Sequence, residues 1–212
     1  MTMSRGRFIV FEGIDASGKS TQVKLLSEYL ESLGEAVHVT AEPTAGPVGS
    51  LIRQAFAERV PLDDRTIAAL FVADRVDHLT NSHDGILDLI ARGVTVICDR
   101  YYLSSLAYHA GDVDASWIEH SNSISTDLLR PDLTVYIDVD PDVAGSRLME
   151  RRERIDKFEV RDRLLSAYKN YEDALPAAAR RESVVRVAGD RPREEVFNDV
   201  IHAVQSAGLV SV

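Results

Sequence analysis

The sequence predicts a doubly wound α/β domain, in which a five-stranded parallel sheet carries helices on both faces. Short runs rich in β-branched and apolar residues alternate along the chain with stretches of helical periodicity. The first, third and fourth runs are continuously apolar, which is typical of parallel strands covered on both faces. A glycine-rich loop joins the first run to the first helical stretch. These three observations favour an open α/β sheet over a helical bundle or a β-sandwich.

The runs expected to form strands are residues 7–12, 36–41, 94–98, 133–139 and 184–188. After the first run, apolar side chains from Val23 to Leu33 recur on one face of a helix. Gly34 can close this helix in a left-handed cap, because glycine adopts positive φ without steric cost. The first strand and helix are therefore expected to flank the glycine-rich loop directly.

Capping residues and prolines place three further helices. Asp63 and Asp64 can cap a long helix that continues through Phe71 and residue 75. Pro141 suits the first turn of another helix, which follows the fourth strand. A last helix is expected from about residue 159 to 175, ending before Pro176.

The composition suits one globular domain spanning residues 1–212. The chain is 45% hydrophobic and 27% charged, close to globular averages. Apolar runs stay well below the roughly 20 residues needed to span a bilayer, and the N-terminal MTMSRGR lacks the apolar stretch of a signal peptide. Cys98 is the single cysteine, so an internal disulfide is impossible. We expect a cytoplasmic protein without a membrane partner.

The charge distribution argues against a nucleic acid partner and for a focused anion site. The net charge of −10 repels nucleic acid phosphates. Residues 147–163 are the exception, with seven basic residues against five acidic ones, a local charge of +2. The six histidines show no spacing typical of a transition-metal site.

The glycine-rich loop matches a phosphate-binding pattern. Residues 13–21, GIDASGKST, fit GxxxxGK[ST] directly after a predicted strand and directly before a predicted helix. Glycines let backbone N–H groups turn toward phosphate oxygens, and the helix N-terminus adds its positive dipole end. The residues expected to hold the nucleotide are Gly13, Ile14, Asp15, Ala16, Ser17, Gly18, Lys19, Ser20 and Thr21. The fold expected is therefore of the P-loop NTPase type.

Two side chains of this loop carry specific chemistry. Lys19 is a point charge for the β- and γ-phosphates of ATP, and Ser20 offers its hydroxyl to Mg²⁺. Thr21 is expected to contact the α-phosphate. A P-loop alone leaves GTPases, motor ATPases and small-molecule kinases open. The guanine signature NKxD of GTPases is absent. Asp99 and Arg100 directly follow the third strand, at the edge where ligands bind in open α/β sheets.

With these motifs in place, the chain resembles the thymidylate kinase family over about residues 7–204. The family's FEGxDxxGKST loop is found at residues 11–21, its DR(Y/H) element at 99–101 and its LFxxxR element at 70–75, and an arginine-rich lid follows a strand ending in IDV. The lid is expected at about residues 146–159. The resemblance implies an ATP-dependent nucleoside monophosphate kinase that uses Mg²⁺ to transfer the γ-phosphoryl group of ATP to dTMP, giving dTDP. It also implies a homodimer.

The resemblance assigns the thymine base to Phe71 and Arg75. Phe71 is expected to stack on the ring, while Arg75, four residues on and so on the same helix face, donates to its O4. An arginine facing the N4 amino group of cytosine would leave two donors unpaired, at a cost of about 1–3 kcal/mol in a buried site. Taken alone, Phe71 fits a core residue better, and Arg75 beside it in the family's pattern reverses that preference.

The resemblance implies a second group of residues around the acceptor's sugar and phosphate. Arg100 is expected to hold the dTMP phosphate, since a planar fork matches two oxygens, although a surface ion pair with Asp99 is the alternative. The other residues implied are Asp15 near the 3′-hydroxyl and the metal shell, Asp99 in that shell through water, Arg53 as a second phosphate contact, Tyr108 against the ribose 2′ carbon, and Ser104 and Ser105 near base or sugar. For Arg53 the alternative is a solvated side chain on a helix surface.

The catalytic cation is expected on the lid, because the P-loop position that carries an arginine in some relatives is Ala16 here. We favour Arg151, with Arg152 and Arg154 as alternatives, for stabilising charge on the transferring phosphoryl group. Arg147 resembles the family's adenine-stacking arginine, and residues 188–192, AGDRP, resemble the loop that edges the adenine. The alternative is an amphipathic helix whose arginines pair with neighbouring glutamates.

Two points stay open at this level. Many relatives carry TREP where this chain has Ala41 before Glu42 and Pro43, so the role of that arginine is absent or relocated, and the isomer of the Pro43 peptide bond is undetermined.

Two rival functions also remain. One is a pyrimidine monophosphate kinase that also accepts dUMP, because one methyl group gives only about 1–3 kcal/mol of discrimination. The other is a non-catalytic P-loop protein that uses ATP as a switch.

Overall fold

The sheet of the protein is parallel throughout, as its apolar strands predict. The computed structural model describes residues 5–111, 113–151 and 157–210. Within them five strands form one sheet in the order β2-β3-β1-β4-β5. The strands are β1 (Phe8–Glu12), β2 (Val37–Ala41), β3 (Thr95–Asp99), β4 (Leu133–Asp138) and β5 (Val184–Ala188). All five predicted strands are confirmed, with ends that shift by one residue.

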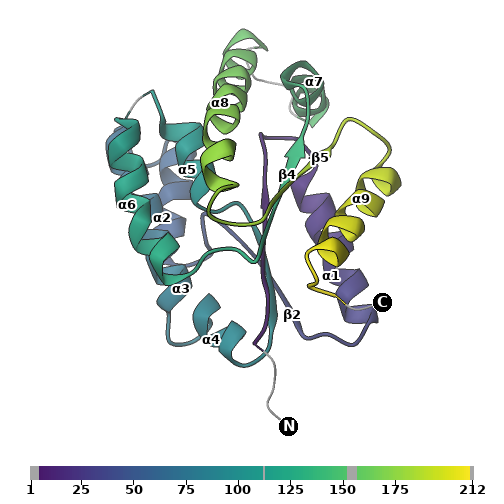
Figure 1. Ribbon diagram of the computed structural model, residues 1–212. Helices are drawn as coiled ribbons and strands as arrows, with labels where there is room; N and C mark the ends of the chain where they lie inside the picture. The colour runs from purple at the N-terminus through teal and green to yellow at the C-terminus, as the bar shows by residue number, and fades with distance from the viewer. Residues whose placement is uncertain (1–4, 112, 152–156, 211–212) are drawn as a thin grey trace.

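Helices cover both faces of this sheet (Figure 1). On one face lie α1 (Lys19–Ser32) and α9 (Arg193–Ser206), which contact each other. On the other face lie α2 (Pro47–Phe56), α3 (Asp64–Thr80), α4 (Ile86–Ala91), α5 (Tyr102–His109), α6 (Ala115–Leu128) and α8 (Lys157–Ala178). Between β4 and α8 lies α7 (Pro141–Arg151), which packs on α8. The doubly wound α/β class is confirmed.

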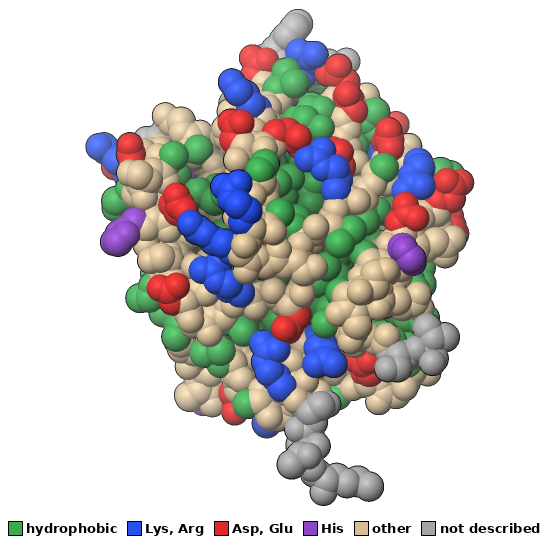
Figure 2. All heavy atoms as spheres, viewed as in Figure 1, with side chains coloured by type: hydrophobic (Ala, Val, Ile, Leu, Met, Phe, Trp, Pro, Cys, Tyr) green, Lys and Arg blue, Asp and Glu red, His purple; other side chains and the backbone are tan. Residues whose placement is uncertain are grey.

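The core lies on both sides of the central strand β1. Phe8, Ile9 and Phe11 have no exposed surface, and they pack between α1 and the helices of the opposite face. A strand buried on both faces must be apolar throughout, which is why β1 shows no alternation. Figure 2 shows acidic and basic side chains interspersed over one face of the molecule. Among the described residues, no helix is long and apolar enough to cross a membrane.

Helix ends follow the predicted capping chemistry. Gly34 has a φ of 84°, and its N–H donates to the carbonyl oxygen of Glu31 while the N–H of Glu35 donates to that of Leu30. This is the paired bond pattern of a Schellman motif. Asp63 caps α3, because its carboxylate accepts from the N–H of Thr66 at 2.8 Å. Both predicted caps are confirmed.

One predicted boundary is wrong. The helix expected to stop before Pro176 is α8, which continues to Ala178 with Pro176 in its last turn. In the interior of a helix, proline removes one backbone hydrogen bond and distorts the turns around it. Close to the C-terminus the same loss affects only the last turn. The N–H of Ala179 still donates to the carbonyl oxygen of Leu175 at 2.9 Å. The helix therefore tolerates the proline.

Strand pairing places the phosphate loop beside the end of β3. In the register of β1 with β3, Phe11 lies opposite Asp99, and the N–H of Arg100 donates to the carbonyl oxygen of Phe11 at 2.9 Å. The loop that follows β1 and the residues that follow β3 thus leave the sheet at the same edge. Ligands of open α/β sheets bind at this carboxyl edge.

Candidate active site

The phosphate loop has the backbone that its glycines predict. Gly13 has a φ of 143°, and a Cβ there would lie 2.6 Å from the carbonyl oxygen of Ile137 on the neighbouring strand. Gly18, with a φ of 101°, caps the N-terminus of α1. Ala16, whose φ is 59°, is a non-glycine residue in the left-handed region. The loop therefore turns sharply from strand to helix and leads into the N-terminus of α1, whose first N–H groups are donors of the kind that phosphate binding uses.

Lys19 is buried against this loop. Its Nζ donates to the carbonyl oxygen of Ile14 at 2.9 Å, and only 5% of the residue is exposed. Burial and the neighbouring charge of Arg100 lower the pKa of Lys19 to about 8. A cation with so little water around it gains strongly from a phosphate partner, which fits the role expected of Lys19.

Ser20 and Asp99 offer a donor set that suits Mg²⁺. The hydroxyl of Ser20 donates to Oδ2 of Asp99 at 2.6 Å, across the junction of the loop and β3. The other oxygen of Asp99, Oδ1, is buried and has no hydrogen-bond partner within the described part of the chain. Hydroxyl and carboxylate oxygens are ligands that Mg²⁺ prefers, and this ion keeps several waters, so two protein groups suffice.

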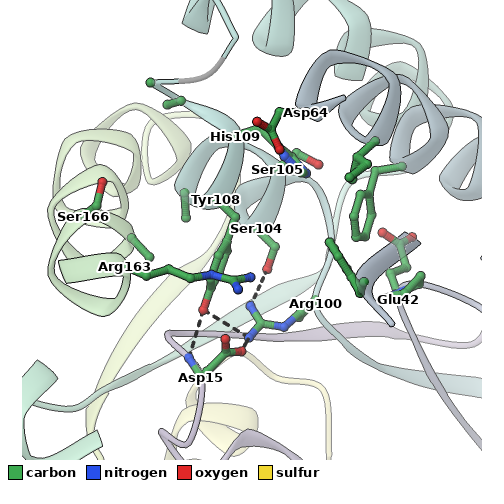
Figure 3. A pocket seen from close by; sticks show the side chains of 18 of the residues that line it. Asp15, Glu42, Asp64, Arg100, Ser104, Ser105, Tyr108, His109, Arg163 and Ser166 are labelled. Carbon is green, nitrogen blue, oxygen red and sulfur yellow. Dashed lines mark hydrogen bonds and ion pairs between the residues drawn. The ribbon is translucent and has the colours of Figure 1, made fainter. Parts of the chain in front are cut away.

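Arg100 lies at the centre of the site. Its Nη2 lies 2.5 Å from Oδ1 of Asp15, and its Nη1 donates to Ser104 Oγ at 3.0 Å (Figure 3). Nη1 also donates to the carbonyl oxygen of Gly13 at 3.2 Å. The guanidinium carbon lies 4.8 Å from the ring centroid of Tyr108. Its backbone has a φ of 76°, a strained conformation of the kind that clusters at functional sites. The guanidinium is thus fixed in position beside the phosphate loop.

A buried carboxylate that sequence reasoning missed supports Arg100 from behind. Glu12 is 1% exposed, and it accepts from Ser104 Oγ at 2.6 Å, from Tyr171 Oη at 2.8 Å and from the N–H of Tyr101 at 2.9 Å. Burial raises the pKa of Glu12, against the effect of these hydrogen bonds and of Arg100. The signal available was a glutamate at the end of a fully apolar strand, where charged side chains are rare unless paired.

Asp15 and Tyr108 complete the phosphate end of the site. The N–H of Asp15 donates to Oη of Tyr108 at 2.9 Å. Burial opposes ionisation of Asp15, but the charges of Arg100, Lys19 and Arg163 outweigh it and lower the pKa of the carboxyl group. Burial raises the pKa of Tyr108 to about 12, so its hydroxyl stays protonated at neutral pH.

Arg75 and Phe71 lie at the opposite end of the site, on one face of α3 as their spacing predicts. Arg75 is fully buried. It donates from Nε to Glu42 at 2.7 Å and from Nη1 to Ser105 at 3.1 Å. Further bonds join it to Asn122 and to the carbonyl oxygen of Tyr101. The ring of Phe71 lies 5.2 Å from that of His109. Glu42, Asn122 and His109 were not predicted as site residues.

A single cavity of about 850 Å³ joins the two ends. The residues that line it include Asp15, Arg100 and Tyr108 at one end and Phe71 and Arg75 at the other, together with Ser104 and Ser105. Figure 3 shows Asp15, Arg100 and Tyr108 grouped together, with Glu42 and His109 apart from them. The structure therefore brings together seven of the eight residues predicted to bind the acceptor.

Arg53 is the exception. Its guanidinium donates to the carbonyl oxygen of Pro43 at 3.0 Å and to Ser50 Oγ at 3.0 Å, and it does not line the cavity. The peptide bond between Glu42 and Pro43 is cis, which answers the question that the sequence left open. Arg53 therefore supports the turn after β2 in this structure, and its contact with a phosphate stays a prediction.

The segment predicted to form the lid, residues 146–159, is only partly described. Arg147 lies on α7, and its Nη2 donates to the carbonyl oxygen of Gly189, in the loop predicted to edge the adenine, at 3.0 Å. Arg152, Arg154 and the side chain of Arg151 lie outside the described residues. The prediction that one of these three stabilises the transition state therefore stays a prediction.

These features define a class of protein. The phosphate loop leads into α1, and beside it lies a cavity with a guanidinium at one end and an aromatic ring at the other; this is the layout of a P-loop nucleoside monophosphate kinase. A family model described as thymidylate kinase matches residues 11–200. The chain belongs to the thymidylate kinase family. Membership of this family supports phosphorylation of dTMP by ATP as its activity.

Named relatives cover most of the chain. A probable thymidylate kinase of Pyrococcus horikoshii is 42% identical over 161 residues, which is 73% of this chain and 75% of the relative. The thymidylate kinase of Plasmodium falciparum is 31% identical over 94% of this chain and 90% of its own length. That of Syntrophus aciditrophicus is 34% identical over 95% of this chain and 98% of its own.

Proposed function

We propose that this chain transfers the γ-phosphoryl group of ATP directly to the phosphate of dTMP, giving dTDP and ADP, with the residue roles derived below. One observation carries the assignment of roles: a single cavity joins Arg100, beside the phosphate loop, to Phe71 and Arg75 at its far end. A nucleoside monophosphate has the same layout, with a phosphate at one end and a base at the other. The acceptor is thereby oriented with its phosphate toward the loop.

The donor side uses the loop and one metal ion. Lys19 binds the β- and γ-phosphates, and the N–H groups at the start of α1 surround their oxygens. Ser20 and Asp99 would hold Mg²⁺, which neutralises charge on the phosphates when bound. Arg147, fixed to Gly189, lies beside the loop expected to edge the adenine.

The base end selects a pyrimidine with a carbonyl group at position 4. Arg75 donates to Ser105 Oγ, so the hydroxyl hydrogen of Ser105 is left to donate, and both residues line the cavity. The N–H groups of Arg75 are already bonded within the protein, so the Ser105 hydroxyl is the donor that meets the base. This donor matches O4 of thymine and clashes with the N4 amino group of cytosine. Phe71 offers the face on which the ring stacks. The hydroxyl of Tyr108 lies nearer the loop, against the sugar.

Transfer needs no covalent intermediate. Arg100 holds the acceptor phosphate in line with the γ-phosphate, while Asp15 stays ionised beside it and the 3′-hydroxyl of the sugar. The remaining positive charge comes from the lid, where we propose Arg151, with Arg152 and Arg154 as alternatives. Positioning and electrostatic stabilisation then supply most of the acceleration.

A substrate panel tests this function. Initial rates with ATP and Mg²⁺ are measured for dTMP, dUMP, dCMP, UMP and AMP. We expect the highest turnover with dTMP, weaker turnover with dUMP, and the lowest rates with dCMP and AMP. Highest turnover on another acceptor would reassign the base end. ATP binding without ADP formation on any acceptor would favour the P-loop switch instead.

We also propose that the enzyme is a homodimer. Trp117, Ile124 and Leu128 lie on one line along α6, since their spacings of seven and four residues return to the same helix face. Their exposed fractions are 41%, 52% and 43%. Several large apolar side chains exposed on one helix face are typical of a protein interface.

A further inference from the structure

An arginine outside the predicted site reaches into the acceptor cavity. Arg163 lies on α8, one turn before Ala167, and lines the cavity together with Arg100 and Tyr108. Its guanidinium carbon lies 5.7 Å from the ring centroid of Tyr108, and that of Arg100 lies 4.8 Å from the same centroid. Figure 3 shows the Arg163 side chain extending from its helix across Tyr108 toward Arg100 and Asp15. Two guanidinium groups thus share one aromatic ring at the phosphate end.

We propose that Arg163 is a second guanidinium for the phosphate of the acceptor nucleotide, facing Arg100 across the end of the cavity. This inference rests on the proposed function, because it takes the acceptor's phosphate to lie beside Arg100. The acceptor's phosphate would then be recognised by a residue of α8, in addition to the contacts from the lid and the phosphate loop. The ligand class is a nucleoside 5′-monophosphate.

The charges at this end of the cavity call for an anion. Arg100 and Arg163 line this end of the cavity, and both act on Asp15, the carboxylate that lines it with them. Lys19 also acts on Asp15, but it lies outside the cavity lining and has Asp99 and Glu12 as further acidic neighbours. The other two carboxylates of the cavity lining lie elsewhere: Glu42 pairs with Arg75, and Asp64 lies next to His109 (Figure 3). Cations that converge on one carboxylate repel one another unless a further negative charge joins them. A phosphate dianion supplies that charge.

A packing role alone explains Arg163 less well. The contact with Tyr108 could serve to hold α8 against α5. These helices are already joined by Asn170, which donates to the carbonyl oxygen of Ala107 at 2.9 Å, and by Tyr171, which bonds to Ser104 at 2.9 Å. Arg163 is also exposed to solvent, so its cation–π contact with Tyr108 is worth only about 0.5–1 kcal/mol. The helix therefore keeps its place without this contact.

Comparison of dTMP with thymidine separates the two roles. Dissociation constants for both ligands are measured by titration calorimetry or NMR on the wild type and on the variants Arg163→Ala, Arg163→Lys and Lys169→Ala. Lys169 is an exposed cation on the same helix that does not line the cavity, so its variant controls for loss of one charge. Melting temperatures confirm that each variant is folded.

We expect Arg163→Ala to weaken dTMP binding about tenfold, as for the loss of one exposed charge-assisted hydrogen bond, and to leave thymidine binding within about twofold. Arg163→Lys should fall between, and Lys169→Ala should match the wild type. Equal losses for both ligands, or unchanged dTMP binding, would overturn the role of Arg163. If the wild type itself binds dTMP no better than thymidine, the proposed function fails first, and the assignment of Arg163 falls with it.

Discussion

Arg100 and Asp15 form an ion pair, 2.5 Å between Nη2 and Oδ1, that joins the end of β3 to the phosphate loop. The pair sits where the acceptor cavity meets the donor loop, and the hydroxyl of Tyr108 bonds to both residues. Asp15 holds the guanidinium on one side, while Ser104 and the carbonyl oxygen of Gly13 hold it on another. The acceptor clamp therefore has a fixed position relative to the donor phosphates, which is what in-line transfer requires.

Replacing Arg100 by Ala should abolish the acceptor clamp and spare the donor site. We expect kcat/KM for dTMP to fall about 10²–10³-fold, because the substitution removes a charge-assisted bond and the alignment it provides. ATP affinity, measured by fluorescence titration, should change by less than about threefold. Arg100→Lys keeps the charge without the fork and should recover part of the rate. Turnover that survives Arg100→Ala unchanged would mean that another group holds the phosphate.

Local chemistry explains which parts of the site the sequence could predict. The phosphate loop is a contiguous motif whose glycines are required by its own backbone, so Gly13 through Thr21 are found without tertiary information. Phe71 and Arg75 share a face because they are four residues apart on a helix. Tyr108 and Arg100 likewise belong to one short segment. Each of these predictions depends on spacings of a few residues.

Long-range partners were out of reach. Glu42 bonds to Arg75 across 33 residues, and Tyr171 bonds to Glu12 across 159 residues. Hydrophobic periodicity indicates that such residues lie on helices or strands, but it does not say which buried acid meets which donor. Arg163 was seen only as part of a basic stretch, because its direction depends on how α8 packs on α5. Pairing between distant elements was the missing information.

The buried pair of Arg75 and Glu42 should respond asymmetrically to substitution. Both side chains are 1% exposed, and Glu42 also bonds to His78 at 3.2 Å. Arg75→Met leaves a buried carboxylate without its main partner and should lower the free energy of unfolding by about 3–5 kcal/mol, measured by urea denaturation. The double variant with Glu42→Gln should regain part of this loss, since the uncompensated charge is gone. Strictly additive losses would show that the two residues act independently.

His109 should make the stability of the protein sensitive to mild acid. Burial and the charge of Arg75 lower its pKa to about 4, below the ordinary value of 6.5. The unfolded chain therefore binds a proton in the interval from pH 6.5 to 4 that the folded chain does not, so the stability present above pH 6.5 is lost as the pH falls. The contribution amounts to about 2 kcal/mol between pH 7 and 5.

The matched variant for this effect is His109→Asn, which keeps a polar side chain without a titrating group. Its own stability differs from that of the wild type by a constant amount, so only the pH dependence is compared. Urea denaturation at pH 5, 6 and 7 should give a flatter profile for the variant. Parallel profiles would show that His109 is protonated in the folded state as readily as in the unfolded chain.

The apolar stripe on α6 should set the oligomeric state. Ile124, the most exposed of its three members at 52%, lies between Trp117 and Leu128. Ile124→Lys would place a charge in the centre of the proposed interface, where desolvation makes it costly, and should convert a dimer into a monomer in light scattering after size exclusion. Leu33→Lys makes the same change at an apolar residue that is 49% exposed at the end of α1, and it should leave the dimer intact. If the wild type has the mass of one chain at tens of micromolar, the interface is refuted. In that case no second copy covers the apolar stripe at a concentration where a stable dimer would form.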